Sequence, residues 1–285
     1  MIEAEGLTMR YGPVRALNNV SFKVNRGEIV GLLGPNGAGK STTMKILTTY
    51  LHPTGGRAKV GGIDVLENPL EARGAIGYLP ETLPLYMDME VCAYLKFVGN
   101  ARGLTGGYLK ERTELVLEEC GLEAMYRKVI RELSKGFKQR TALAQALIHD
   151  PDIIVLDEPT SGLDPHQIVE IRELIRKLAG GKTVLLSTHI LQEIEASADR
   201  IIIISNGSLV ADGTFDELRD GVKKHERVKI SVKGESKEIE RLLSGVEGSQ
   251  EIHASGTSDG YASFIVLGKP GTELWREVSS FARAQ

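Results

Sequence analysis

The chain has 285 residues, of which 41% are hydrophobic and 26% are charged, a composition typical of folded globular proteins. This length supports one large domain, or a medium domain with a smaller one, and excludes a disordered or fibrous protein. The 35 basic and 38 acidic residues give a net charge of −3, so no overall field favours nucleic acid or an anionic membrane surface. Cys92 and Cys120 lie in no CxxC motif or histidine cluster, which indicates a reducing compartment and disfavours a zinc or disulfide framework.

The N-terminal residues, MIEAEGL, carry neither a basic segment nor an apolar one of the kind that directs secretion. No stretch of the chain approaches the ~20 apolar residues of a membrane-spanning helix. We therefore expect a cytoplasmic protein, and we expect any membrane role to come through a partner protein.

Short, apolar, β-branched runs recur before residue 214 and predict the buried strands of a largely parallel sheet. These runs lie at residues 29–33, 153–156, 184–186 and 201–204. The helical patterns between them lie at residues 43–51, 110–120, 138–148, 165–178 and 189–196. This alternation predicts an α/β fold with right-handed crossovers, and residues 83–131, which contain no strand run, are interpreted as a helical insertion.

The pattern changes after Gly213, where a predicted helix at residues 214–219 precedes a second domain. Its predicted elements are a strand at 228–232, a helix at 237–243, a strand around Ile252, a strand at 261–267 and a helix at 272–284. This order predicts a small α+β domain of ferredoxin-like type over residues 222–285, after a first domain over residues 1–221. Such a domain would normally have one more strand, and its near-neutral charge offers no basic patch for RNA.

Residues 34–41 read GPNGAGKS and match G-x-x-x-x-G-K-[ST], directly after one predicted strand and at the start of a helix. In this motif the backbone N–H groups wrap phosphates, the lysine reaches the β- and γ-phosphates, and the serine hydroxyl binds Mg²⁺. An ordinary glycine-rich turn is the alternative, and the flanking strand and helix disfavour it. The residues expected to bind a nucleotide here are Gly34, Asn36, Gly37, Ala38, Gly39, Lys40, Ser41 and Thr42.

A nucleotide site of this kind needs a carboxylate for magnesium and a second group to polarise the attacking water. Asp157 and Glu158 follow the apolar run Ile153 to Leu156 and supply both at the end of a buried strand. We assign Asp157, with Ser41, to the metal ion and Glu158 to the general base. The alternative is a pair of exposed acids at a strand end.

Four further segments complete a pattern: LSKGFKQR at 133–140, SGLD at 161–164, STH at 187–189 and RYG at 10–12. Together with the phosphate loop, this array resembles the ATP-binding-cassette (ABC) ATPases, and the resemblance covers residues 1 to about 218. It implies that two such domains pair head to tail and enclose two ATP molecules. The phosphate loop of one domain would then face Ser134 and Gly136 of the other.

The resemblance also implies roles for three single residues. His189 would contact the γ-phosphate and orient the water, although a lone histidine is more often a surface or capping residue. Tyr11 would stack on adenine, against the alternative of packing on a sheet edge. Asp164 would bridge the two subunits, against the alternative of capping the helix that begins at Pro165.

Two departures from the family pattern concern the chemistry. Glu81 stands where the family has a glutamine, and its carboxylate could still reach magnesium or the water. Lys135 replaces a glycine and Phe137 a glutamine in the signature segment, while its serine and second glycine remain. This form is similar to exporter-type subunits of bacteria, such as those tied to gliding motility, drug efflux or nitrous-oxide-reductase maturation. Those subunits usually continue into a final strand and helical tail, so we expect a shortened chain.

The resemblance implies an ATPase subunit that binds ATP and Mg²⁺ and drives separate transmembrane permease subunits, with no nucleic-acid partner. Such a subunit would lie on the inner face of the cell membrane, held there by its partner. One alternative is a soluble ABC ATPase that acts on ribosomes or DNA, and another is a non-hydrolytic regulatory module. We expect the partner to dock near Glu81, Leu83, Leu85, Tyr86 and Met87.

Overall fold

A computed structural model describes residues 1–222, 226–258, 261–268 and 273–284 of the chain. The chain forms two compact units, Met1–Phe215 and Asp216–Gln285. The helix α8 (Phe215–Val222) contains both this division and the boundary predicted after residue 221. Within the residues described, no helix combines the length and the apolar character needed to span a membrane.

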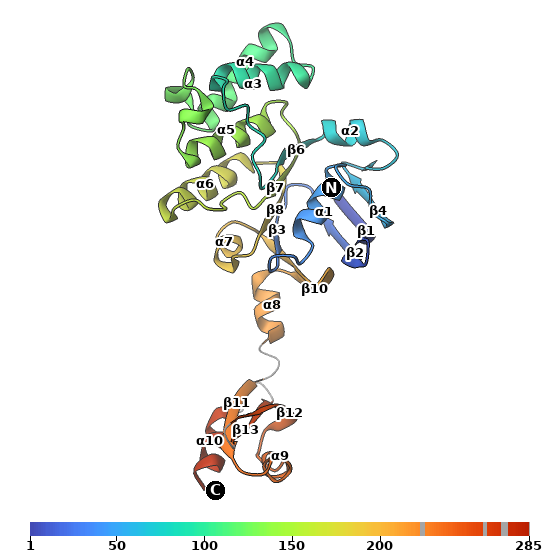
Figure 1. The fold of residues 1–285 in the computed structure, drawn as a ribbon, viewed down its shortest axis with the longest axis vertical. Helices are drawn as coiled ribbons and strands as arrows, with labels where there is room; N and C mark the ends of the chain where they lie inside the picture. Colours follow the sequence, from blue (N-terminus) through green and yellow to red (C-terminus); the bar gives the residue numbers. More distant parts are fainter. Residues whose placement is uncertain (223–225, 259–260, 269–272, 285) are drawn as a thin grey trace. The chain divides into compact units, whose positions relative to one another are not determined.

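The first unit is built on a six-stranded, mainly parallel sheet, with the strand order β10-β9-β3-β8-β7-β6 (Figure 1). Its strands are β3 (Ile29–Leu33), β6 (Ile76–Leu79), β7 (Ile153–Asp157), β8 (Thr183–Thr188), β9 (Arg200–Ser205) and β10 (Ser208–Gly213). The four predicted apolar runs form β3, β7, β8 and β9, so the α/β prediction is confirmed. Every residue of β7 and β8 is buried, which explains the apolar runs at residues 153–156 and 184–186 within them.

A second, antiparallel sheet lies beside the first and has the order β2-β1-β4-β5. Its strands are β1 (Ile2–Tyr11), β2 (Val14–Val24), β4 (Gly55–Val60) and β5 (Ile63–Asp64). The helix α1 (Lys40–Leu47) contacts strands of both sheets and lies between them in Figure 1. One hydrophobic core includes residues of both sheets and of α1, so the phosphate-loop helix is held from two sides.

The predicted insertion at residues 83–131 contains α3 (Val91–Ala101), α4 (Gly106–Glu119) and the short 3₁₀ helices η1 (Glu123–Met125) and η2 (Ile130–Glu132), but no strand. The remaining helices of this unit are α2 (Pro69–Gly74), α5 (Lys135–Leu147), α6 (Pro165–Leu178) and α7 (Leu191–Glu195). The helix α1 begins at Lys40, three residues before the predicted start at residue 43, because the phosphate loop passes directly into it.

The second unit has the order β11 (Glu226–Lys233), α9 (Ser236–Leu243), β12 (Ser249–Ser258), β13 (Tyr261–Gly268) and α10 (Leu274–Ala284). Its antiparallel sheet has the order β11-β13-β12, as expected for a ferredoxin-like β-α-β-β-α arrangement. Seven buried apolar residues from α9, β13 and α10 give this unit a core of its own. Thr272, the predicted start of the last helix, lies outside the described residues.

Candidate active site

The loop between β3 and α1 follows a path that its glycines permit. Gly37 and Gly39 have φ angles of 78° and 110°, in the left-handed region that favours glycine. A side chain at Gly34 would place its Cβ atom 2.2 Å from the Ile204 carbonyl oxygen. The loop therefore presents backbone to its surroundings, as a phosphate cradle must.

A pocket of about 350 Å³ opens over this loop. Its lining residues are Ala16, Asn36, Gly37, Ala38, Gly39, Lys40, Ser41, Thr42, Glu81 and Glu158. Seven of the eight residues predicted to bind a nucleotide line the pocket, and the eighth, Gly34, begins the loop and accepts a hydrogen bond from Lys40 Nζ at 2.8 Å. The pocket thus gathers the predicted phosphate ligands with two carboxylates.

Asp157 lies at the end of β7, where β8 and α1 each supply a hydroxyl group to it. The Oδ1 atom of Asp157 accepts hydrogen bonds from Ser187 Oγ at 2.6 Å and from Ser41 Oγ at 3.2 Å. Asp157 is 2% exposed, so these contacts fix the carboxylate in place. Hydroxyl and carboxylate oxygens at this separation are a donor set suited to Mg²⁺, so Ser41 and Asp157 fit the ion that the sequence predicts.

Glu158 is the most constrained residue of the site. Its φ angle is 50°, and its backbone N–H donates to the Oγ atom of Ser187 at 3.0 Å. Its Oε1 atom lies 3.2 Å from Lys40 Nζ, and its Oε2 atom lies 2.9 Å from His189 Nδ1. Because Glu158 and Lys40 are both buried, this ion pair is held in a site of low solvent access. The predicted base therefore contacts both Lys40, the predicted phosphate ligand, and His189, the histidine predicted to contact the γ-phosphate.

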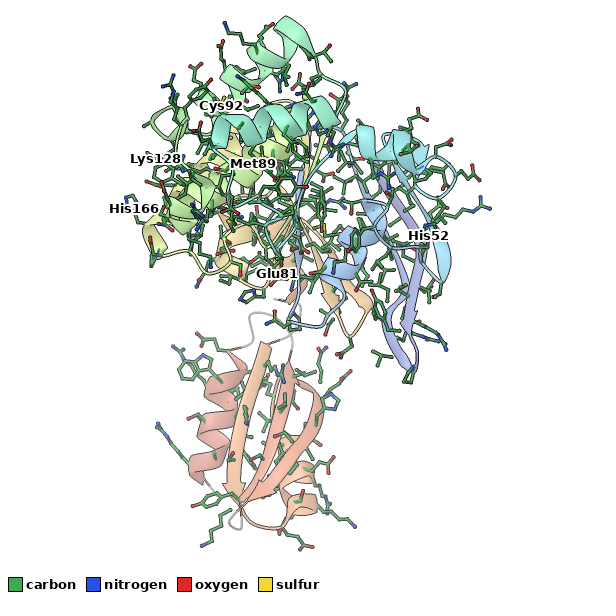
Figure 2. The ribbon with its side chains drawn as sticks, turned by 45° about the horizontal axis from the view of Figure 1, so that its top comes forward. His52, Glu81, Met89, Cys92, Lys128 and His166 are labelled. Carbon is green, nitrogen blue, oxygen red and sulfur yellow. The ribbon has the colours of Figure 1, made fainter. Side chains whose placement is uncertain are left out.

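Glu81 and Tyr11 differ in their position relative to the phosphate pocket. Glu81 lines the phosphate pocket, and its side chain lies beside the phosphate loop in Figure 2. It also lines a larger cavity of about 480 Å³, together with Asp157 and Tyr78. Tyr11 is 47% exposed at the turn between β1 and β2 and is not among the residues that line the phosphate pocket, whereas Ala16 is.

The signature segment lies at a separate hollow of about 210 Å³, which shares no lining residue with the phosphate pocket. Ser134 is the N-cap of α5, where its Oγ atom accepts from the Phe137 N–H group at 3.4 Å. A Cβ atom at Gly136 would lie 3.1 Å from the side chain of Gln167. Within one chain, Ser134 and Gly136 are therefore not brought to the phosphate loop.

Asp164 is the N-cap of α6, and its Oδ1 atom accepts from the Gln167 N–H group at 2.9 Å. Asp164 therefore caps α6 within the single chain, as the alternative interpretation of this residue predicts. The role of Asp164 between two subunits stays a prediction.

The predicted docking segment needs one correction. Leu85 is 8% exposed, whereas Tyr86 and Met87 are 55% and 43% exposed. Leu85 packs into the protein, so it is wrong as a docking residue, and the exposed apolar surface of this segment is carried by its two neighbours. An unbroken run of apolar residues in a loop does not indicate which side chains are buried and which are exposed.

Sequence reasoning did not assign a role to Ser187 or Gln167. Ser187 belongs to the segment STH, in which only His189 was given a role. Its contact with Asp157 depends on β7 and β8 being neighbouring strands. Gln167 follows Asp164 by three residues, and only the packing of α6 against α5 brings it to the signature hollow.

A family model described as ABC transporter matches residues 17–161, which include the phosphate loop, the signature segment and the Asp157–Glu158 pair. The chain belongs to the ABC transporter family. The matched region contains Lys40, Ser41, Asp157 and Glu158, whereas Ser187 and His189 lie beyond it. A second family model, described as an AAA domain, matches residues 128–195.

Curated relatives of this ABC chain are ATP-binding proteins of transporters. YbhF of Escherichia coli, named a probable multidrug ABC transporter ATP-binding protein, is 44% identical over 223 residues, which make up 77% of this chain and 38% of YbhF. The daunorubicin resistance ATP-binding protein DrrA3 of Streptomyces coeruleorubidus is 39% identical, with coverage of 76% of this chain and 69% of the relative. The bacitracin transport ATP-binding protein BcrA of Enterococcus faecalis is 37% identical, with coverage of 81% and 75%.

Solved structures of ABC cassettes share the fold. The ATP-binding subunit of an ABC transporter superposes with a TM-score of 0.71 at 34% identity, covering 78% of this chain and 93% of that one. A dimeric, post-hydrolysis cassette bound to ADP and Pi gives a TM-score of 0.68 at 28% identity, covering 75% and 98%. The cassette fold of the first unit is therefore established.

Proposed function

We propose that this chain is the ATP-hydrolysing, nucleotide-binding subunit of an ABC transporter and drives a separate transmembrane partner. The observation that carries the proposal is the contact chain from Lys40 through Glu158 to His189 over the phosphate pocket. We propose further that residues 1–221 form the ATPase domain and residues 222–285 an accessory domain.

ATP binding redistributes the contacts of Lys40. In the structure its ammonium group lies between the Gly34 carbonyl oxygen, at 2.8 Å, and the Glu158 carboxylate, at 3.2 Å. The β- and γ-phosphates offer more negative charge and compete for the same ammonium group. Lys40 then turns to the phosphates and leaves Glu158 Oε1 free to accept a proton from the attacking water.

The other residues hold this arrangement. Ser41 and Asp157 would hold Mg²⁺, which neutralises charge on the phosphate oxygens when bound. His189 keeps its contact with Glu158 Oε2 and orients the carboxylate, while Glu81 lines the same pocket and would offer its carboxylate to the metal or the water.

We propose that a second copy of the cassette completes the site. The signature hollow at Ser134 and Gly136 has a helix N-terminus, which favours negative charge, but lies apart from the phosphate pocket of its own chain. A head-to-tail partner would present this surface to the γ-phosphate, with Asp164 and Tyr11 near the shared interface. ATP thus acts as the link between two chains.

The surface proposed for the transmembrane partner lies on the helical insertion. Tyr86 contacts the ring of Phe97 at a centroid distance of 5.3 Å, and both side chains and that of Met87 are exposed. The loop is fixed beneath them, because the Arg131 N–H donates to the Met87 carbonyl oxygen and the Ile130 N–H to that of Met89, each at 2.9 Å. Figure 2 marks Met89 in this region. A fixed loop with exposed apolar side chains is suited to a protein interface.

The chemistry disfavours a non-hydrolytic module, because the base Glu158 is present and oriented. The relatives described above carry transport or drug-resistance names, which favours an exporter over a ribosome- or DNA-directed ATPase. The subunit would accordingly be cytoplasmic and held at the inner face of the membrane by its partner.

The test is Mg²⁺-dependent ATP hydrolysis by the purified full chain, compared with Lys40→Ala. The wild type should turn over ATP, while Lys40→Ala should lose tight binding and turnover, because the charge on the phosphates is removed. Co-purification of a membrane protein with the wild type supports the transporter role. A wild-type chain that binds ATP but never hydrolyses it, with or without a partner, would contradict the proposal.

A further inference from the structure

A buried carboxylate next to the site is used by none of the steps above. Glu193, in α7, is 7% exposed, and its Oε2 atom accepts hydrogen bonds from Thr160 Oγ1 and Thr188 Oγ1, each at 2.8 Å. Thr160 and Thr188 are 5% and 1% exposed. One carboxylate oxygen thus joins two hydroxyl groups that are 28 residues apart in the sequence, in an environment that excludes water.

Both hydroxyl groups belong to segments that carry catalytic residues. Thr188 directly precedes His189, and its Oγ1 atom also accepts from the Ile190 N–H group at 3.1 Å. The backbone is therefore tied down on both sides of the histidine. Glu193 accepts the hydrogen bond from Thr188 Oγ1 from the following helix, α7.

Thr160 lies in the turn that begins at Glu158. This turn is closed by a hydrogen bond from the Ser161 N–H group to the Glu158 carbonyl oxygen at 3.0 Å and by one from the Leu163 N–H group to the Thr160 carbonyl oxygen at 3.2 Å. The turn leads directly to Asp164. The Thr160–Glu193 bond therefore anchors the segment that leaves the base and carries the residue proposed to meet the second chain.

We infer that Glu193 is a positioning residue, which holds the His189 segment and the Glu158 turn in one relative arrangement. Asp157 and Ser187 already fix the ends of β7 and β8 to each other, and Glu193 extends that fixation to the residues beyond the strands. A buried carboxylate is well suited to this, because hydroxyl donors left without their acceptor in a dry site are costly. The inference rests on the proposed ATPase function and adds a residue to it.

The expected effect is on turnover rather than on ATP binding. Glu193 does not line the phosphate pocket, and its two hydroxyl donors lie outside residues 34–42. The phosphate loop is held by α1 and the two sheets, so it keeps its shape when Glu193 is changed. By contrast, the alignment of Glu158 with His189, on which proton transfer depends, is lost when Glu193 is changed.

The experiment measures kcat and the Kd for ATP in the full chain. Glu193→Ala should lower kcat by about tenfold or more while the Kd stays within about threefold of wild type. Glu193→Gln keeps an oxygen that can accept both hydroxyl groups, so it should retain kcat to within about threefold. Glu195→Ala is the matched control, because Glu195 is an exposed carboxylate on the same helix and its loss should change neither quantity.

A double-mutant cycle separates positioning from general loss of stability. Thr160→Val removes one hydroxyl group at nearly constant shape and should lower kcat in the wild type but not further in Glu193→Ala, since the acceptor is already gone. Should Glu193→Ala fail to fold, Thr160→Val and Thr188→Val decide the question, because their losses in kcat should overlap rather than multiply.

Three outcomes would overturn the inference, given a wild type that hydrolyses ATP. A folded Glu193→Ala with kcat within about twofold of wild type is one. The second is that Thr160→Val lowers kcat equally in the wild type and in Glu193→Ala. The third is that the kcat losses of Thr160→Val and Thr188→Val multiply fully. A wild type without any hydrolysis would instead contradict the proposed function itself.

Discussion

The surroundings of His149 disfavour the protonated, charged form of its imidazole. Its Nε2 atom lies 3.1 Å from the carbonyl oxygen of Ile76, and its Nδ1 atom is buried with no hydrogen-bond partner among the described residues. Burial, and then the nearby guanidinium of Arg102, lowers the pKa of His149 to about 4. The folded protein therefore holds this imidazole neutral at pH values where an unfolded chain would protonate it.

The stability of the first unit should fall as the pH falls from 6.5 to 4. In that window the unfolded state, with a histidine pKa near 6.5, binds a proton that the folded state does not. Because His149 is partly exposed, we expect a loss of roughly 1–2 kcal/mol over this range, below the full linkage value. Urea unfolding at pH 7 and pH 4.5 should show this loss in wild type and less of it in His149→Gln.

The control for this prediction is His52→Gln, because the side chain of His52 is exposed. His52→Gln should keep the wild-type pH dependence. An equal pH dependence in His149→Gln and wild type would show that burial of His149 does not control stability there.

Single residues of the site could be predicted from sequence where a motif fixes both identity and spacing. Lys40, Ser41, Asp157 and Glu158 are of this kind: Lys40, Ser41 and Glu158 line one pocket, and Asp157 accepts a hydrogen bond from Ser41 beside it. The contacts of Glu193 could not be predicted, because its two hydroxyl partners lie on different loops. Their meeting depends on how β7 and β8 pair, which no local pattern encodes.

At the scale of elements, the buried strands were predicted and the antiparallel sheet was missed. The strands β3, β7 and β8 each contain an unbroken apolar run, because both of their faces are covered. In β1 and β2, by contrast, buried residues alternate with partly or fully exposed ones, and that alternation is weak as a sequence signal. The helix α6 was predicted with its observed bounds, because Asp164 and Pro165 form a cap and a first turn.

The exposed surface of the helical insertion should determine assembly with the membrane partner. Met87→Asp places a charge on this surface without entering the core, since Met87 is 43% exposed. We expect unchanged ATP hydrolysis by the isolated chain and loss of the complex in a membrane pull-down. Leu70→Asp, at an exposed apolar residue of α2, is the matched control and should leave assembly intact. Normal assembly and transport by Met87→Asp would place the interface elsewhere.

At the scale of the whole molecule, the catalytic residues and the second unit are separate in the chain. Every residue that lines the phosphate pocket lies between Ala16 and Glu158, within the unit Met1–Phe215. The second unit has its own core around Phe264. The phosphate pocket thus belongs to the first unit, and we propose that the second unit modulates pairing or partner contact.

Removing residues 222–285 should leave the Kd for ATP within about threefold of the full chain, because no pocket residue is lost. The same deletion should change the lifetime of the ATP-bound dimer or its assembly with the partner. Isothermal titration calorimetry gives the Kd, and full-length Lys40→Ala provides a non-binding reference. A shortened chain that folds by circular dichroism yet binds no ATP would show that the second unit contributes to the nucleotide site.

Pairing of two chains should depend on ATP if, as proposed, the signature hollow of a second chain completes each site. Glu158→Gln, which cannot complete hydrolysis, should sediment as a monomer without nucleotide and as a dimer with saturating ATP. Adding Ser134→Arg should block closure while leaving binding intact, because the bulky side chain fills the surface that we propose to face the γ-phosphate of the second chain. A Glu158→Gln chain that binds ATP yet stays monomeric would point to a different partner cassette.

The central claim is that Glu158 activates the water that attacks ATP bound at the phosphate loop, and single-turnover hydrolysis tests it most directly. Glu158→Gln should bind Mg²⁺-ATP with a Kd within a few-fold of wild type, because the phosphate ligands are intact. Its single-turnover rate should fall by about 100-fold or more, since the amide cannot accept the proton. Glu158→Gln hydrolysing bound ATP at the wild-type rate would contradict the account.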